Sequence, residues 1–174
     1  MHPDLLASIE RFRTEMETVD EMAHVLLKGH LLIEEGLSAV LDQYVFHREH
    51  LEEARLTFAQ KAHIARALCL RKKTLGEWEL VFAINALRNN LAHKLNSPER
   101  SKRLAKVKDV YFREAAGFER VEEVKKESDT VVLFNACAHS AGFLSTFLAD
   151  SRGFRQMVHA MDRQLNPNLP PFEL

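Results

Sequence analysis

Apolar residues recur every three or four positions along most of the chain, the spacing of a helix with one buried face. The first such stripe is formed by Leu5, Leu6, Ile9, Phe12 and Met16. A denser run, "EMAHVLLKGHLLIEEGLSAVLDQYVF", follows Thr18 and Asp20, either of which could cap a helix. Its density predicts a central helix that is buried on more than one side.

Helix start signals divide the rest of the chain. Thr57–Gln60 ("TFAQ") and Thr74–Glu77 ("TLGE") have the spacing of a capping box. Ser97 before Pro98, and Ser128 before Asp129, are further starts. We expect helices over about 58–71, 75–94 and 98–115, one over "TVVLFNACAHSAGFLSTFLA" and a short one over about 152–165, with "HREHLEEAR" as a polar connection.

No segment of useful length alternates with a period of two, so no sheet is expected. Three of the five prolines lie in the closing stretch "NPNLPPFEL", which favours an extended tail. The sequence therefore predicts an all-α fold: a single-domain helical bundle of about six to seven helices over residues 1–165, followed by a Pro-rich C-terminal tail over 166–174.

Composition narrows the class of protein. A chain of 174 residues that is 46% hydrophobic can bury a core. The net charge of -1 excludes a strong overall attraction to nucleic acid, although a local basic patch is compatible with it. We predict no membrane span and no signal peptide, and we read Cys69 and Cys137, each in an apolar helical pattern, as reduced thiols. The expected location is the cytoplasm.

One polar cluster interrupts an apolar helix. It is "RNNLAH", with Arg88, Asn89, Asn90 and His93. Histidine can move protons near neutral pH, and the arginine fork fits a phosphate. Together they suit metal-independent cleavage of RNA, in which the 2′-hydroxyl is the nucleophile, His93 moves a proton and Arg88 stabilises the transition state. Asn89 lies four residues before His93 and would orient it.

The same residues have a plain structural interpretation. Arg88 would be a solvated helix residue and His93 a polar residue favoured near a helix end by the dipole. On an ideal helix Arg88 and His93 are about 140° apart, so convergence requires a bend near Asn89–Asn90 or a wrapped arginine. Spacing alone does not decide between the two interpretations.

The motif and its context resemble the HEPN superfamily, whose members often carry Arg, a polar residue, three residues and then His. "LLKGHLLIEEGLSAVLDQYV" and "ARLTFAQKAHIARAL" also look like the helices that precede the motif in small bacterial HEPN-like proteins. The resemblance covers approximately residues 20–95. It implies a helical bundle, with Arg88, Asn89 and His93 as the residues that match the motif.

Active HEPN proteins are endoribonucleases that need no metal or other cofactor, and many are toxins or defence components. The resemblance therefore implies a homodimer, an RNA substrate and a cognate antitoxin or regulatory protein. Other relatives lack the activity and serve as dimerisation, adaptor or regulatory modules, and the mannitol operon repressor family is a similar helical group. A non-catalytic regulator is thus the alternative.

Polar residues of the central helix offer support for the motif. Lys28, His30 and Glu34 lie in an otherwise apolar run, with His30 and Glu34 four residues apart on one face. A carboxylate there could orient the histidine and raise its basicity. The alternative is a polar pair that fixes the register between helices.

Two basic runs bracket the helix that carries the motif, and an RNA backbone would need such charge. They contain Arg71, Lys72 and Lys73 on one side and Arg100, Lys102 and Arg103 on the other. A charge run is more commonly a solvated face. No metal site is expected, since His47, His50 and Glu53 lack a further strong ligand nearby. No glycine-rich phosphate loop is present either.

Overall fold

The computed structural model describes residues 20–70, 75–93 and 98–172, and for Leu75, Ala92 and His93 it describes the backbone alone. These residues form seven helices and no strand, which confirms the all-α prediction. The helix predicted over Leu5–Met16 lies outside the described residues.

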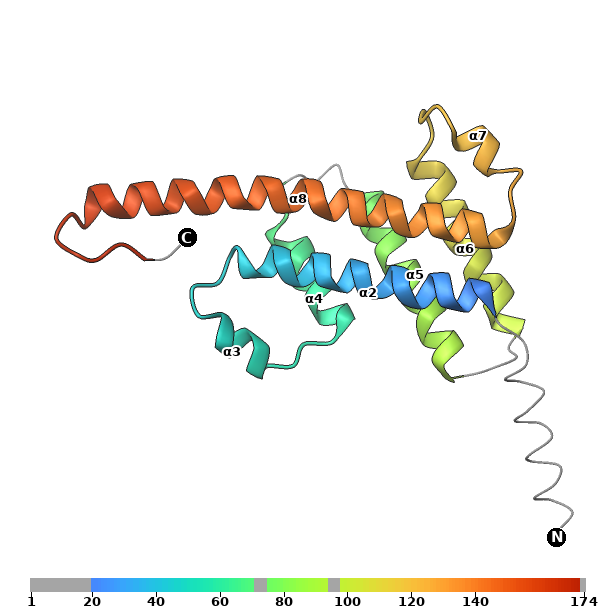
Figure 1. The fold of residues 1–174 in the computed structure, drawn as a ribbon, viewed down its shortest axis with the longest axis horizontal. Helices are drawn as coiled ribbons and strands as arrows, with labels where there is room; N and C mark the ends of the chain where they lie inside the picture. The colour runs from blue at the N-terminus through green and yellow to red at the C-terminus, as the bar shows by residue number, and fades with distance from the viewer. Residues whose placement is uncertain (1–19, 71–74, 94–97, 173–174) are drawn as a thin grey trace, which may run out of the picture.

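Two long helices form one layer of the bundle. α2 (Glu21–Asp42) begins at Asp20, whose carboxylate accepts from the Ala23 amide at 2.9 Å. α8 (Asp129–Leu165) begins at Ser128, as the sequence predicted. The two helices run side by side in the same direction (Figure 1). Their close approach depends on glycine, because a Cβ at Gly29 would stand 2.5 Å from the Cys137 Sγ.

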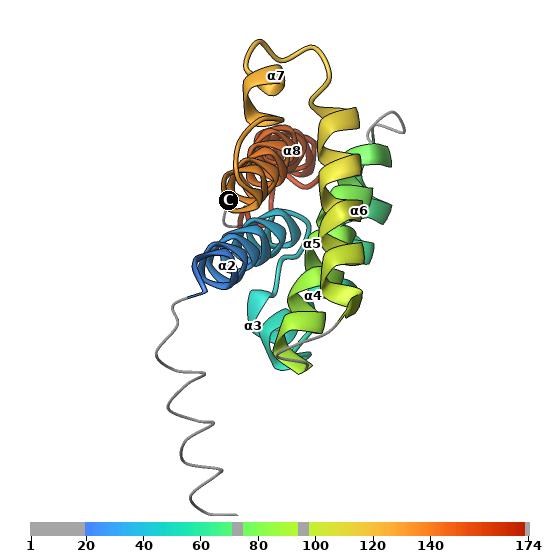
Figure 2. The same cartoon turned by 90° about the vertical axis from the view of Figure 1, so that its right-hand side faces the viewer.

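A second layer crosses the first at a steep angle, as Figure 2 shows. It consists of α4 (Phe58–Leu68), α5 (Leu75–His93) and α6 (Pro98–Glu114). Thr57 caps α4 with both hydrogen bonds of the predicted capping box. The core between the layers is fully buried and includes Trp78, Ile33, Leu37, Ile84 and Leu133.

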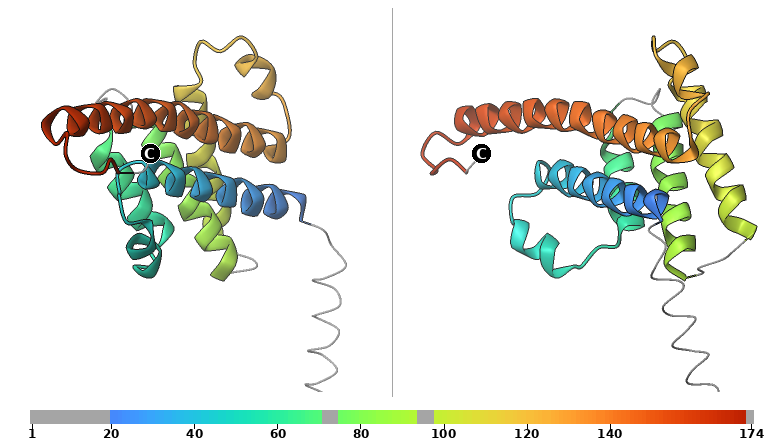
Figure 3. Two further views of the ribbon diagram at one scale, coloured as in Figure 1. Left: turned by 60° about the vertical axis from the view of Figure 1, so that its left-hand side comes forward. Right: turned by 45° about the vertical axis from the view of Figure 1, so that its right-hand side comes forward.

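The remaining helices are short. α3 (Arg48–Glu53) replaces the polar connection that the sequence predicted, and α7 (Val121–Val124) links α6 to α8. Neither places more than one residue in the core. Figure 3 shows both at the edges of the molecule.

The predicted break before residue 152 does not exist. α8 continues for 37 residues and its C-terminal part projects beyond the bundle (Figures 1 and 3). Ser151 is buried there, and its hydroxyl donates to the Phe147 carbonyl of the preceding turn at 2.8 Å. The serine therefore forms a hydrogen bond inside α8 and does not cap a new helix. After α8, Phe172 returns to pack against the rings of Phe46 and His159.

Length and composition alone would let α8 cross a membrane. Core helices of soluble bundles pass the same test, and α8 supplies Val132, Leu133, Ala136 and Leu144 to the core. The observation is weak support for a membrane span.

Candidate functional site

The motif occupies the last turns of α5, and the helix is unbroken through it. Residues 88–93 are helical throughout, so the two asparagines do not interrupt α5. On this backbone Arg88 and His93 leave the axis about 140° apart. The His93 side chain is outside the described residues, and its relation to Arg88 and Asn89 stays a prediction.

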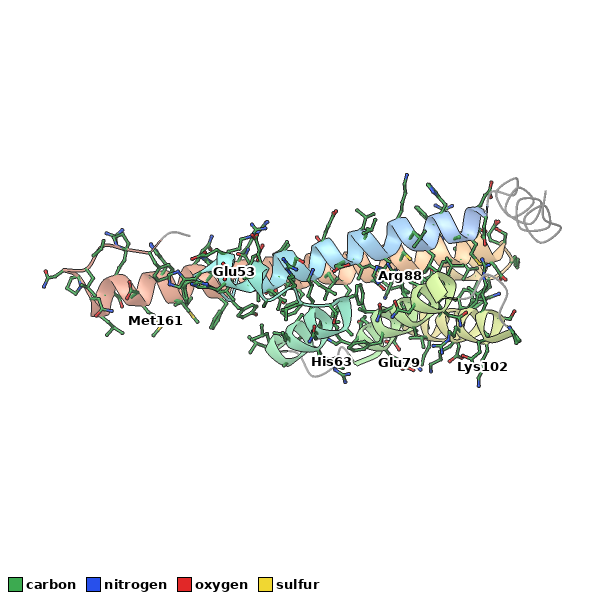
Figure 4. The ribbon with its side chains drawn as sticks, turned by 90° about the horizontal axis from the view of Figure 1, so that it is seen from below. Glu53, His63, Glu79, Arg88, Lys102 and Met161 are labelled. Carbon is green, nitrogen blue, oxygen red and sulfur yellow. The ribbon has the colours of Figure 1, made fainter. Side chains whose placement is uncertain are left out.

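Arg88 is half-buried between α5 and α2. Its Nη1 donates to the Asn89 Oδ1 at 3.3 Å, while its Nε is buried without a hydrogen-bond partner among the described residues. In Figure 4 Arg88 lies toward α2, whereas Glu79 and Lys102 lie on the side away from it. The guanidinium therefore retains donor capacity next to the central helix.

His30 of α2 faces the same part of α5. Its Nε2 lies 3.0 Å from the Asn85 Oδ1, and its ring stacks on Phe58 at 4.1 Å between centroids. Only 4% of the residue is exposed. Asn85 precedes Arg88 by three residues and shares its helix face, so the hydrogen bond holds His30 close to Arg88.

The surroundings of His30 favour its neutral form. Burial is the main cause of a lowered pKa, and the Arg88 charge lowers it further. The hydrogen bond with Asn85 and the charge of Glu34 act in the opposite direction without reversing the shift. A neutral imidazole beside a guanidinium avoids the repulsion that two cations would suffer.

Glu34 approaches His30 through its charge and not through a hydrogen bond in the described structure. Its Oε1 accepts from the Lys61 Nζ of α4 at 2.9 Å, with both side chains largely shielded from water. Lys28 is exposed, and it leaves α2 about 200° around the axis from His30. Of the three supporting residues, His30 and Glu34 are therefore near the motif and Lys28 points elsewhere.

The two asparagines of the motif differ in burial. Asn89 is exposed and accepts from Arg88, as described above. Asn90 is half-buried, and its Oδ1 is buried without a partner among the described residues. Asn90 and Arg88 thus each have, at the same end of α5, one buried polar atom that no described residue satisfies.

The basic runs contribute little free charge where the structure describes them. Arg100 pairs with Asp20, and Arg103 pairs with Glu99 at 2.9 Å. Lys102 is exposed and forms no ion pair with the described residues. Arg71, Lys72 and Lys73 lie outside the described part of the chain, so their predicted role in RNA binding is an expectation only.

Two residues at this place were not expected from the sequence: Asn85 and Lys61. Each lies on the face of its helix that meets α2, and only the tertiary contact reveals its partner. Across the described ranges, no group of three or more His, Cys, Asp or Glu side chains could hold a metal ion.

Comparison of the chain with family models, with curated proteins and with solved structures finds no match. The resemblance to the HEPN superfamily therefore rests on the quoted motifs, together with the all-α fold that the structure has.

Proposed function

We propose that this protein is a metal-independent endoribonuclease whose site forms at the end of α5 around Arg88 and His93. The observation that supports the proposal best is the half-buried Arg88, whose Nε has no hydrogen-bond partner among the described residues and whose charge acts on His30 of α2. A phosphate at this position would supply the acceptors that the guanidinium lacks.

The chemistry assigns distinct roles. Arg88 stabilises negative charge as the 2′-hydroxyl attacks the phosphorus, and His93 transfers the proton. His30 is too deeply buried to reach RNA, and its hydrogen bond with Asn85 lies one turn before Arg88 on the same face of α5. Asn89 holds the other side of the guanidinium. No cofactor takes part in this scheme.

The test is incubation of purified protein with total RNA in EDTA. We expect cleavage by the wild type and at least a ~100-fold loss in Arg88→Ala and His93→Ala, since general acid–base groups typically contribute 10²–10⁴-fold. Arg120→Ala and His50→Ala, at exposed positions, are the matched controls. Intact RNA with the wild type, or equal cleavage by Arg88→Ala, would refute the proposal.

The biological setting follows from the same resemblance. We propose a cytoplasmic toxin or defence component that acts as a homodimer and is held in check by an antitoxin. Induced expression should then arrest growth, and Arg88→Ala should relieve the arrest at equal protein level. If Arg88→Ala arrests growth as strongly as the wild type, the arrest does not result from RNA cleavage at this site.

A second candidate is a non-catalytic regulator or adaptor module. The observation that favours it is the satisfaction of the polar groups on α2: His30 is bonded to Asn85 and stacked on Phe58, and Glu34 is paired with Lys61. These contacts join α2 to α4 and α5, as register-fixing pairs do. In this case Arg88→Ala lowers the melting temperature while the wild type leaves RNA intact.

A further inference from the structure

A large hollow of the described surface lies away from the motif. It is an apolar groove of about 820 Å³, with one wall from α8 and the other from the ends of α4 and α5 and the loop after α6. Glu77 marks its position on α5, and Arg88 lies three turns further, roughly 16 Å along the helix. The groove is therefore separate from the proposed nuclease site.

The α8 wall of the groove continues past the bundle. Groove-lining positions 139, 143, 146, 150, 153 and 157 follow helical spacing, and Met161 and Leu165 extend the same stripe. Met157, Met161 and Leu165 are 53%, 52% and 75% exposed. In Figure 4 Met161 lies on the projecting part of α8, beyond the other labelled residues. One helix thus carries both a groove and an exposed apolar end.

The tail covers only the other side of the projection. Phe172 packs on His159, and Phe46 lies over Arg155, which donates to the carbonyls of Asp42 and Val45. His159 and Arg155 leave the axis about 140–180° from the stripe. Within the described ranges, the chain therefore supports one face of the projecting helix and leaves the stripe uncovered.

No contact with the described residues requires glycine at two positions on the groove side. A Cβ at Gly142 or Gly153 would meet nothing within 4 Å, unlike one at Gly29. Glycine inside a helix costs about 1 kcal/mol relative to alanine. Ala149 and Ala160 lie on the same side of α8 and are also exposed, so the four positions form a row of small residues. The open space suits the close approach of a second helix.

We propose that this surface binds a second copy of the chain, with the two α8 helices antiparallel about a two-fold axis near Gly153. Each projecting end then fills the partner's groove, so the contact is self-complementary and closes on itself. Met161 lies over Phe143 and Thr146 of the other copy, and Leu165 lies near His139 and Gly142. This pairing does not depend on the nuclease proposal.

Size and charge agree with such a pair. The stripe from residue 139 to 165 is roughly 39 Å long, and half of a helix circumference is roughly 17 Å, which gives on the order of 650 Å² per copy. Standard interfaces bury about 600–1,000 Å² per partner. Asp150 is the acidic position on the stripe, and the symmetry places it beside Gln156 of the other copy, an amide donor.

Sedimentation velocity over a dilution series tests the proposal without RNA. We expect a dimer for the wild type and an increase in Kd above ~30-fold for Met161→Asp, because the symmetry removes the apolar contact of Met161 at both ends of the interface. Phe134→Asp is the matched control, since Phe134 is 61% exposed on the first half of α8. A monomeric wild type, or equal dissociation by Phe134→Asp, overturns the proposal.

Cross-linking tests the position of the axis. In a Cys69→Ser background, Gly153→Cys should form an intermolecular disulfide on oxidation, since facing Cα atoms of close helices lie roughly 3–5 Å apart. Arg152→Cys points about 100° away and should not. Absence of the Gly153→Cys dimer, or equal cross-linking of both variants, overturns this arrangement. The groove would then be left to a helix of another protein or to the segment before Asp20.

Discussion

His30 on α2 and Asn85 on α5 meet in a hydrogen bond of 3.0 Å, between residues 55 positions apart in the chain. This contact fixes the rotation of α5 against α2. Arg88 lies one turn after Asn85, and its charge acts on His30. The geometry of the candidate site therefore depends on a residue outside the "RNNLAH" motif.

Replacement of Asn85 by alanine should destabilise the fold. His30 would keep a buried ring nitrogen without its partner, a loss that typically costs about 1–3 kcal/mol. Urea unfolding of Asn85→Ala and of Asn89→Ala measures the difference, because Asn89 is exposed and belongs to the same helix. Equal midpoints for the two variants would contradict a structural role for the His30–Asn85 bond.

Stability should decline as the pH falls through the range where His30 titrates in the unfolded chain. The pKa of His30 is lowered from its ordinary 6.5 in the folded protein. Below pH 6.5 the unfolded state thus binds more protons than the folded state. The contribution of neutral His30 to the free energy of unfolding is therefore lost progressively on acidification. Well above pH 6.5 the full contribution of His30 to the free energy of unfolding is present.

The difference between wild type and His30→Gln isolates this effect. Urea midpoints measured at pH 7.5 and 5.5 should fall further in the wild type than in His30→Gln, while other titrating groups cancel in the comparison. Parallel pH profiles for the two proteins would show that His30 does not titrate differently on folding.

Alanine at Gly29 should weaken the contact between α2 and α8. Its Cβ would stand 2.5 Å from the Cys137 Sγ, and such overpacking costs typically about 1–3 kcal/mol. Cys137→Ala removes the obstructing sulfur. The double variant should therefore recover part of the stability that Gly29→Ala loses, and thermal melts of the four proteins in the cycle measure the coupling. If the stability changes of the two single variants simply add in the double variant, the alanine at position 29 does not clash with Cys137.

Cys137 should resist thiol reagents in the folded protein. Burial raises the pKa of its thiol to about 12, so the reactive thiolate is scarce and shielded. Iodoacetamide at pH 8, followed by mass analysis, should leave Cys137 unmodified until urea unfolds the chain. Rapid native modification of Cys137 would show that α8 separates from α2 readily.

The elements that the sequence predicted well are those with local causes. Asp20, Thr57 and Ser128 cap the helices that follow them because a side-chain oxygen reaches an amide three residues away. This geometry is complete within one turn, and the helix starts could be read without knowledge of the fold.

The features that were missed depend on distant partners. The sequence predicted two helices where α8 is continuous, and at the junction the Ser151 hydroxyl bonds within the helix and lies 3.3 Å from the Tyr44 hydroxyl. Arg100 belonged to a predicted basic patch, yet Asp20, far away in sequence, pairs with it. Neither relationship has a signature in the local pattern of residues.

The parallel contact of α2 with α8 also bears on how the chain is made. Residues 43–128 separate the two helices, so the face of α2 that carries Gly29 leaves the ribosome long before the helix that covers it. Non-local contacts of this kind form slowly, and exposed apolar surface on a growing chain invites aggregation. Chains that end before Asp129 should therefore require a chaperone to stay in solution.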